Sequence, residues 1–152
     1  MIGRRFFITA CSLLVLGGGF PSLTLAGEPV IYSNSATGIA INGYDPVAYF
    51  TEDKHVEGNA DFAAQWKEAT WYFSSEKNRT AFLATPEKYA PQYGGYCAFA
   101  MSFDAFAPTV PEAWSIVDGK LYLNFSIGVR GDWIEDKQEH ILRANENWTG
   151  KF

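Results

Sequence analysis

The sequence predicts a small α+β domain with two β-hairpins, short helices and a C-terminal helix. Asp118-Gly119, a dipeptide typical of a two-residue hairpin turn, lies between the alternating runs 113–117 and 120–125. Two further runs rich in aromatic and small residues, 62–66 and 70–74, favour a second hairpin. Apolar residues at sevenfold spacing near the C-terminus indicate a helix. No stretch is long or polar enough to be a linker, so we expect one domain.

The elements before the first hairpin are expected to be short. Residues 27–39 are expected to form a loose N-terminal arm, and residues 40–43 a short strand. Asp45-Pro46 combines an N-cap residue with a proline at the first helical position, which predicts a short helix through Phe50. The polar run 51–59 predicts a loop.

The pattern of the two hairpins leads to specific expectations. The first hairpin should turn across Lys67-Glu68-Ala69, after which Ser75 can cap a helix that runs to about Ala84 and is stopped by Pro86. In the second hairpin, the turn sets Ile116 opposite Leu121, with Trp114 opposite Leu123.

The last element is predicted to be one helix. Asp132 follows Gly131 and is expected to cap it. Its apolar stripe consists of Ile134, Ile141 and Trp148, with Trp133 and Ala144 alongside.

The first 26 residues have the three parts of a secretory signal peptide. Arg4 and Arg5 precede an apolar run over 6–20, and Thr24-Leu25-Ala26 places small residues before a cleavage site. Because this run is shorter than the roughly 20 residues of a spanning helix, we expect no membrane span in the mature chain. The paired arginines resemble a twin-arginine signal, with ordinary secretion as the alternative. Export to a bacterial periplasm follows from either route.

Charge and cysteine content restrict the function. The chain has 17 acidic and 12 basic side chains, a net charge of −5, which argues against nucleic acid as the main partner. Cleavage before Gly27 would leave Cys97 as the one cysteine, so no internal disulfide is possible. Either Cys97 is buried and inert, which we favour, or its sulfur has a chemical role.

No catalytic set emerges from the sequence. There is no Gly-x-Ser-x-Gly elbow, no Cys-x-x-Cys pair and no phosphate-binding glycine loop, and the carboxylates are scattered. His55 lies in a polar loop, and His140 follows Asp136 by four residues, a spacing typical of a surface ion pair. We therefore predict no catalytic residues.

Several separated blocks occur in an order that resembles the longer, exported form of the YHS-domain family, over about residues 40 to 148. The blocks are Gly43-Tyr44-Asp45-Pro46-Val47-Ala48-Tyr49-Phe50, Trp71-Tyr72-Phe73-Ser74-Ser75, Pro86–Ala98 and Asp118–Asn124. The resemblance implies a domain over 40–152 and binding of a metal ion, copper especially.

The chain departs from the short members of that family at their cysteine positions. Those positions correspond here to Ala48, Ser74 and Asn78. Alanine cannot ligate a metal, and serine or asparagine oxygen is a poor ligand for a soft one. The resemblance then leaves Cys97 as the sulfur ligand, with His55 as a second candidate ligand.

Three functions remain open from the sequence. The first is an exported module that binds a copper-class metal ion through Cys97 and His55, helped by Tyr44 or Asp45. The second is a metal-free module that binds a small ligand or a protein through an aromatic-lined groove. The third, an enzyme with an unrecognised site, is the least supported. The residues that we expect at a binding site are Tyr44, Asp45, Tyr93, Gly94 and Gly95, because paired glycines let a backbone turn tightly or approach a ligand closely.

Overall fold

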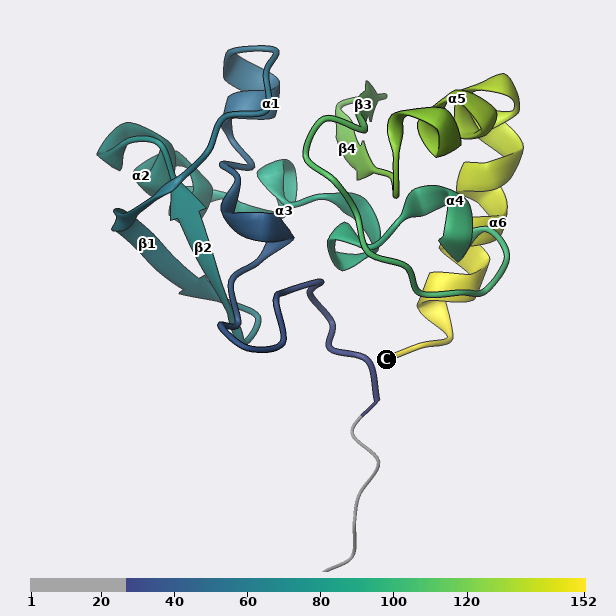
Figure 1. The fold of residues 1–152 in the computed structure, drawn as a ribbon, viewed down its shortest axis with the longest axis horizontal. Helices are drawn as coiled ribbons and strands as arrows, with labels where there is room; N and C mark the ends of the chain where they lie inside the picture. The colour runs from purple at the N-terminus through teal and green to yellow at the C-terminus, as the bar shows by residue number, and fades with distance from the viewer. Residues whose placement is uncertain (1–26) are drawn as a thin grey trace, which may run out of the picture.

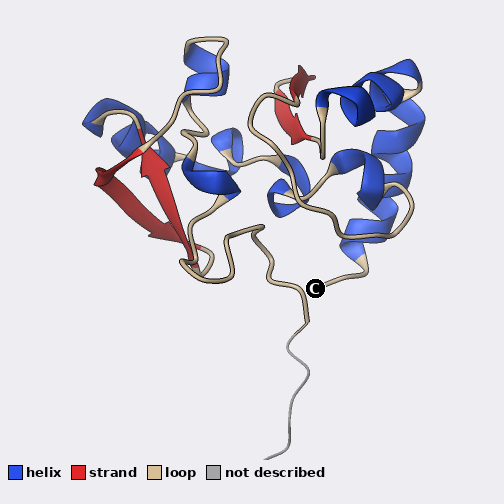
Figure 2. Cartoon of the chain, viewed as in Figure 1, coloured by secondary structure: helices blue, strands red, loops and turns tan. Residues whose placement is uncertain are grey.

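The computed structural model describes residues 27–152. The predicted signal peptide, 1–26, lies outside the described residues. The elements are η1 (Ile41–Gly43), α1 (Ala48–Thr51), β1 (Asn59–Trp66), β2 (Ala69–Phe73), α2 (Glu76–Ala84), α3 (Pro86–Tyr89), η2 (Gln92–Gly95), α4 (Ala98–Met101), β3 (Trp114–Val117), β4 (Lys120–Leu123), α5 (Ile127–Glu135) and α6 (Lys137–Thr149). Two two-stranded antiparallel sheets, short helices and a C-terminal helix confirm the α+β prediction (Figures 1 and 2).

The first hairpin has a tighter turn than predicted. Trp66 pairs with Ala69, so the turn is Lys67-Glu68 alone and Ala69 already belongs to β2. Both turn residues are left-handed, with φ of 49° and 64°. This geometry matches the right-handed twist of the flanking strands, which explains why two residues suffice without a glycine.

The second hairpin follows the prediction. Trp114 pairs with Leu123 and Ile116 pairs with Leu121, and both Asp118 and Gly119 have positive φ. The two-residue turn thus sets the register that the alternating pattern requires.

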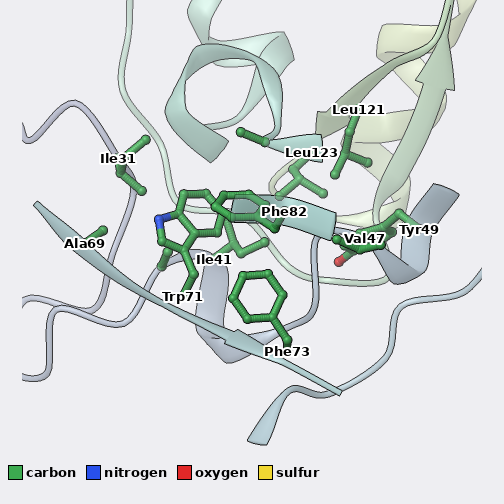
Figure 3. Packing of buried hydrophobic residues seen from close by; sticks show 12 residues of the cluster. Ile31, Ile41, Val47, Tyr49, Ala69, Trp71, Phe73, Phe82, Leu121 and Leu123 are labelled. Atoms are coloured by element: carbon green, nitrogen blue, oxygen red, sulfur yellow. The ribbon is translucent and has the colours of Figure 1, made fainter. Parts of the chain in front are cut away.

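Strand β4 separates two hydrophobic cores because its successive side chains point to opposite faces. Leu121 and Leu123 pack into the first core together with Trp71, Phe73 and Phe82 (Figure 3). The second core contains Tyr122, Tyr93, Ala98, Met101, Trp133 and Ala144. Both faces of β4 are therefore buried.

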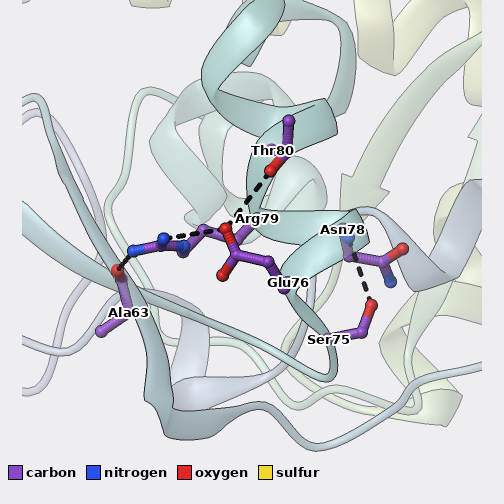
Figure 4. A network of polar contacts seen from close by, with 6 residues as sticks. All are labelled: Ala63, Ser75, Glu76, Asn78, Arg79 and Thr80. Atoms are coloured by element: carbon purple, nitrogen blue, oxygen red, sulfur yellow. Dashed lines mark hydrogen bonds and ion pairs between the residues drawn. The ribbon is translucent and has the colours of Figure 1, made fainter.

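Helix starts agree with the sequence in one case and differ in another. Ser75 caps α2 by accepting a hydrogen bond from the backbone N–H of Asn78 (3.2 Å), as predicted (Figure 4).

The prediction of a single C-terminal helix capped by Asp132 was wrong. Ser126 caps α5, Asp132 lies inside that helix, and a break at Asp136 starts α6. A serine hydroxyl after an exposed phenylalanine marks a helix start as well as an aspartate does.

The segment before Tyr44 also differs from its prediction. Residues 40–43 do not form a strand: Ala40 makes one isolated bridge, to Ser33, and Ile41–Gly43 form a 3-10 turn. Ile41 and Asn42 have φ of 40° and 61°, which is incompatible with an extended strand. Residues 27–39 run beside the domain, with Ile31 buried in the first core.

None of the helices in the part of the chain that the structure describes is long and apolar enough to cross a membrane.

Candidate functional site

Asp45 is a fully buried hydrogen-bond acceptor that joins α1 to the end of β2 and the start of α2. Its Oδ1 accepts from the backbone N–H groups of Val47 (2.8 Å) and Ala48 (3.4 Å), although α1 begins at Ala48 with Val47 as its N-cap residue, two positions later than the start predicted at Asp45-Pro46. Its Oδ2 accepts from the backbone N–H (2.8 Å) and the hydroxyl (2.7 Å) of Ser74 and from Nδ2 of Asn78 (2.7 Å). Five donors thus converge on one carboxylate.

These contacts bring together the three positions at which the sequence resemblance predicts cysteines. Ala48, Ser74 and Asn78 all surround Asp45, although Ala48 and Asn78 are 30 positions apart in the sequence. The nitrogen and hydroxyl groups of these residues donate hydrogen bonds to the carboxylate, whereas a metal ion would need lone pairs from its ligands. These groups therefore do not fit a site for a soft metal ion. They fit a structural hydrogen-bond network instead.

Arg79 connects α2 to the sheet formed by β1 and β2. Arg79 donates from one terminal nitrogen to the backbone carbonyl of Ala63 on β1 (3.3 Å) and from the other to Glu76 (2.8 Å) (Figure 4). The N-terminus of α2, and Asn78 with it, is consequently fixed in front of Asp45.

Cys97 is buried, with 1% of its surface exposed, and its sulfur lies in a second polar cluster. The sulfur accepts from the backbone N–H groups of Phe125 (3.3 Å) and Ala100 (3.5 Å) and contacts Oδ1 of Asn124 (3.6 Å). Asn124 is fully buried, and its Oδ1 also accepts from the N–H of Phe99 (3.1 Å). The cluster ties α4 to the end of β4.

His55 and Tyr44 lie away from Cys97. His55 is exposed in the loop after α1, and its ring lies 6.1 Å from that of Tyr44. Helices α1 and α4 lie on different sides of the molecule (Figure 1). Among residues 27–152, no three histidine, cysteine, aspartate or glutamate side chains are grouped so that they could hold a metal ion. Of the two predicted metal ligands, Cys97 is buried and His55 is exposed.

His140 does not pair with Asp136. Its Nδ1 is 2.9 Å from the hydroxyl of Ser102, and its ring packs 4.9 Å from that of Phe99. Asp136 lies at the break between α5 and α6, where its backbone carbonyl accepts from the N–H of His140. The interpretation as a surface ion pair was wrong, because α4 covers this face of α6.

The paired glycines let the N-terminal arm approach the backbone. The backbone N–H of Tyr32 donates to the carbonyl of Gly94 (2.8 Å), and a Cβ on Gly94 would overlap the carbonyl oxygen of Val30. A Cβ on Gly95 would lie 2.6 Å from the side chain of Ile41. The group that closely approaches Gly94 is therefore the backbone of the N-terminal arm.

A groove lies beside these glycines, where the two cores meet. We call it the aromatic groove: Trp66, Tyr93 and Trp148 line it with Lys67, Lys120 and Glu87, and its volume is about 340 Å³. Trp66 packs against the first core, and Tyr93 and Trp148 belong to the second. The Nζ atom of Lys67 lies 4.5 Å from the centre of the Trp66 ring.

Tyr93 lines this groove but is itself largely buried. Its hydroxyl lies 3.0 Å from Oδ1 of Asn145 on α6, and burial raises the pKa of this hydroxyl well above its usual value. Its backbone is left-handed, with φ of 55°, an unusual conformation for a residue that is not glycine.

A comparison with protein families finds a match in the central part of the chain. Residues 47–93 match the YHS domain. No curated protein and no solved structure matched the chain.

The first core extends beyond the matched segment. Residues 47–93 contribute seven residues to this core, whereas Ile31, Ala40, Ile41, Leu121 and Leu123 come from the flanking segments. The aromatic groove lies at the border of the matched segment: Trp66, Lys67 and Tyr93 are inside the match, and Lys120 and Trp148 are outside.

Of the five residues that the sequence predicts at a binding site, Tyr93 and Gly94 line the aromatic groove, whereas Tyr44, Asp45 and Gly95 do not. No motif connects the other side chains of the groove, which include Trp66, Lys67, Lys120 and Trp148. The high aromatic content of the sequence was the one signal for such a groove, and it does not predict which aromatic rings lie next to one another.

Proposed function

We propose that the protein is an exported, periplasmic YHS-domain binding module that holds a small organic ligand in the aromatic groove. The observation that carries the proposal is the groove itself, which joins three rings from distant parts of the sequence with two lysines. Its volume of about 340 Å³ lies within the range of small-molecule sites. Export rests on the signal-like features of residues 1–26.

The chemistry of the groove favours a planar ligand with an anionic group. Trp66 and Trp148 are each half-buried, so part of each ring is available for stacking. Neither Lys67 nor Lys120 is in an ion pair with a carboxylate of residues 27–152. Glu87 is the one carboxylate that lines the groove, so the two lysines leave the groove with an excess of one positive charge in a chain whose net charge is −5.

A ligand screen tests this function. We expect at least one planar organic anion to raise the melting temperature of the mature protein in the presence of a metal chelator, because a ligand that binds the folded state stabilises it. Replacement of Lys67 by asparagine, which tolerates the left-handed turn, together with Lys120→Gln should weaken binding of that compound about tenfold. Isothermal titration calorimetry measures the change.

The matched control is Lys77→Gln, an exposed lysine on α2 outside the groove. If the double variant and this control bind the compound equally well, the ligand does not occupy the aromatic groove.

Metal handling, which the family resemblance implies, would require Cys97 as the sulfur ligand. Its sulfur already contacts two backbone N–H groups and Asn124, and the family's cysteine positions donate hydrogens to Asp45. A metal ion would have to displace these hydrogen bonds, so the geometry favours the organic ligand.

Metal titration separates the two functions. We expect the reduced mature protein and its Cys97→Ser variant to take up the same amount of Cu(I), well below one ion per chain, in competition with a chromogenic chelator. Stoichiometric uptake by the wild-type protein that is lost in the variant would contradict our proposal and support the metal function.

A further inference from the structure

A second pocket is lined by residues of β3 and of the two C-terminal helices. We call it the cationic pocket: it has a volume of about 370 Å³, and its lining includes Trp114, Ile116, Arg130, Trp133, Ile134 and Lys137, together with Asp53 and Ser115. It shares no lining residue with the aromatic groove. Except for Asp53, these residues lie outside the YHS match.

Arg130 is oriented by the strand beneath it. Its Nε donates to the hydroxyl of Ser115 on β3 (2.8 Å), and Ser115 is itself buried. The guanidinium is half-buried, and within the described residues it forms no ion pair with a carboxylate. Because Nε is occupied, the two terminal nitrogens present a planar pair of donors, the arrangement that binds carboxylate, sulfonate or phosphate oxygens.

Lys137 adds a second positive charge at the first residue of α6. It is half-buried and, like Arg130, forms no ion pair among residues 27–152. Asp53 is the one carboxylate that lines the pocket, and it pairs with neither cation. Two cations therefore face one exposed carboxylate in an acidic protein, which is an arrangement that attracts an anion.

The walls of the pocket are apolar. Ile116 and Ile134 each keep 37% of their surface exposed, and Trp114 is half-buried beside them. Trp133 forms part of the same wall, and its buried indole N–H has no acceptor in the part of the chain that the structure describes. The pocket thus combines unpaired donors with exposed apolar side chains.

We infer that the cationic pocket binds a small organic anion with an apolar body. The acidic group lies on the Arg130 guanidinium, with Lys137 adding a second charge, and the body lies on Trp114, Ile116 and Ile134. The inference is independent of the aromatic groove, since the two sites share no residue.

Two fluorescent probes with a common scaffold test the inference. Anilinonaphthalene sulfonate carries an anionic group, and phenylnaphthylamine has the same ring system without it. We expect saturable, one-to-one binding of the sulfonate to the mature protein, and a loss of affinity of about tenfold or more in Arg130→Gln. The uncharged probe should bind wild-type protein and this variant equally.

Control variants make the result specific. Arg143→Gln removes an exposed arginine of α6 that lies outside the pocket and should bind the sulfonate as wild type does. If Arg130→Gln melts at a lower temperature than wild type, Lys137→Gln serves as the second test and should weaken sulfonate binding at least threefold. Thermal melts of each variant establish that it is folded.

Three results would overturn the inference. The first is wild-type protein without saturable sulfonate binding. The second is equal affinity in Arg130→Gln, Lys137→Gln and Arg143→Gln. The third is a loss of binding in the Lys67→Asn, Lys120→Gln double variant alone, which would place the anion in the aromatic groove.

Discussion

Replacement of Asp45 by alanine should lower the free energy of unfolding by about 3–4 kcal/mol. The carboxylate is fully buried and accepts five hydrogen bonds from Val47, Ala48, Ser74 and Asn78. Its removal leaves buried donors without an acceptor, and each such group costs about 1–3 kcal/mol when its solvation is lost. Urea unfolding followed by tryptophan fluorescence measures the change.

The Asp45→Asn variant separates charge from shape. Asparagine keeps one acceptor oxygen but places an NH2 group opposite the donors that the second carboxylate oxygen accepts from. The loss in free energy of unfolding for Asp45→Asn should therefore lie between zero and the loss for Asp45→Ala. Asp61→Ala, an exposed aspartate on β1, is the control and should change stability by less than about 0.5 kcal/mol. A loss below 1 kcal/mol for Asp45→Ala would contradict the role of this carboxylate as the junction of α1, β2 and α2.

Replacement of Gly94 by alanine should destabilise the protein by about 3 kcal/mol and release the N-terminal arm. Gly94 has φ of 62°, which costs other residues roughly 1–2 kcal/mol, and an added Cβ would overlap the carbonyl of Val30. Release of the arm also exposes Ile31 and breaks the hydrogen bond from Tyr32 to Gly94. Chemical denaturation gives the stability, and hydrogen exchange at Tyr32 reports the arm.

Two other glycines provide matched controls for this substitution. Gly119 has a similar φ of 72° but open space around it, so Gly119→Ala should show the conformational cost alone, about 1–2 kcal/mol. Gly131 lies in α5 with open space and no positive φ, so Gly131→Ala should be neutral or stabilising by up to about 1 kcal/mol. Fast exchange at Tyr32 in all three variants would show that the arm is not held by Gly94.

The local elements of the fold could be predicted where one short segment carries the whole signal. The Asp118-Gly119 turn sets its register through its own backbone conformation, and Ser75 caps α2 through a neighbour three residues away. The Asp132 prediction failed because Ser126, six residues earlier in the chain, supplies an equivalent cap. Local sequence does not decide between two acceptable caps.

The candidate sites depended on contacts that local patterns do not contain. Gly94-Gly95 indicated a close approach, but the sequence did not say that Val30 of the same chain makes it. Cys97 was correctly favoured as buried, and its partners Asn124 and Phe125 are 27 and 28 positions away.

The sequence by itself determined the α+β class, the register of the second hairpin, the cap of α2 and the likeness to YHS domains, because each depends on neighbouring residues or on an ordered set of blocks. Only the tertiary structure decided that Ala48, Ser74 and Asn78 donate to Asp45, that Cys97 is buried whereas His55 is exposed, and that Trp66 and Trp148 line one groove. The physical reason is the packing of two cores against opposite faces of β4, which joins side chains that are far apart in the chain.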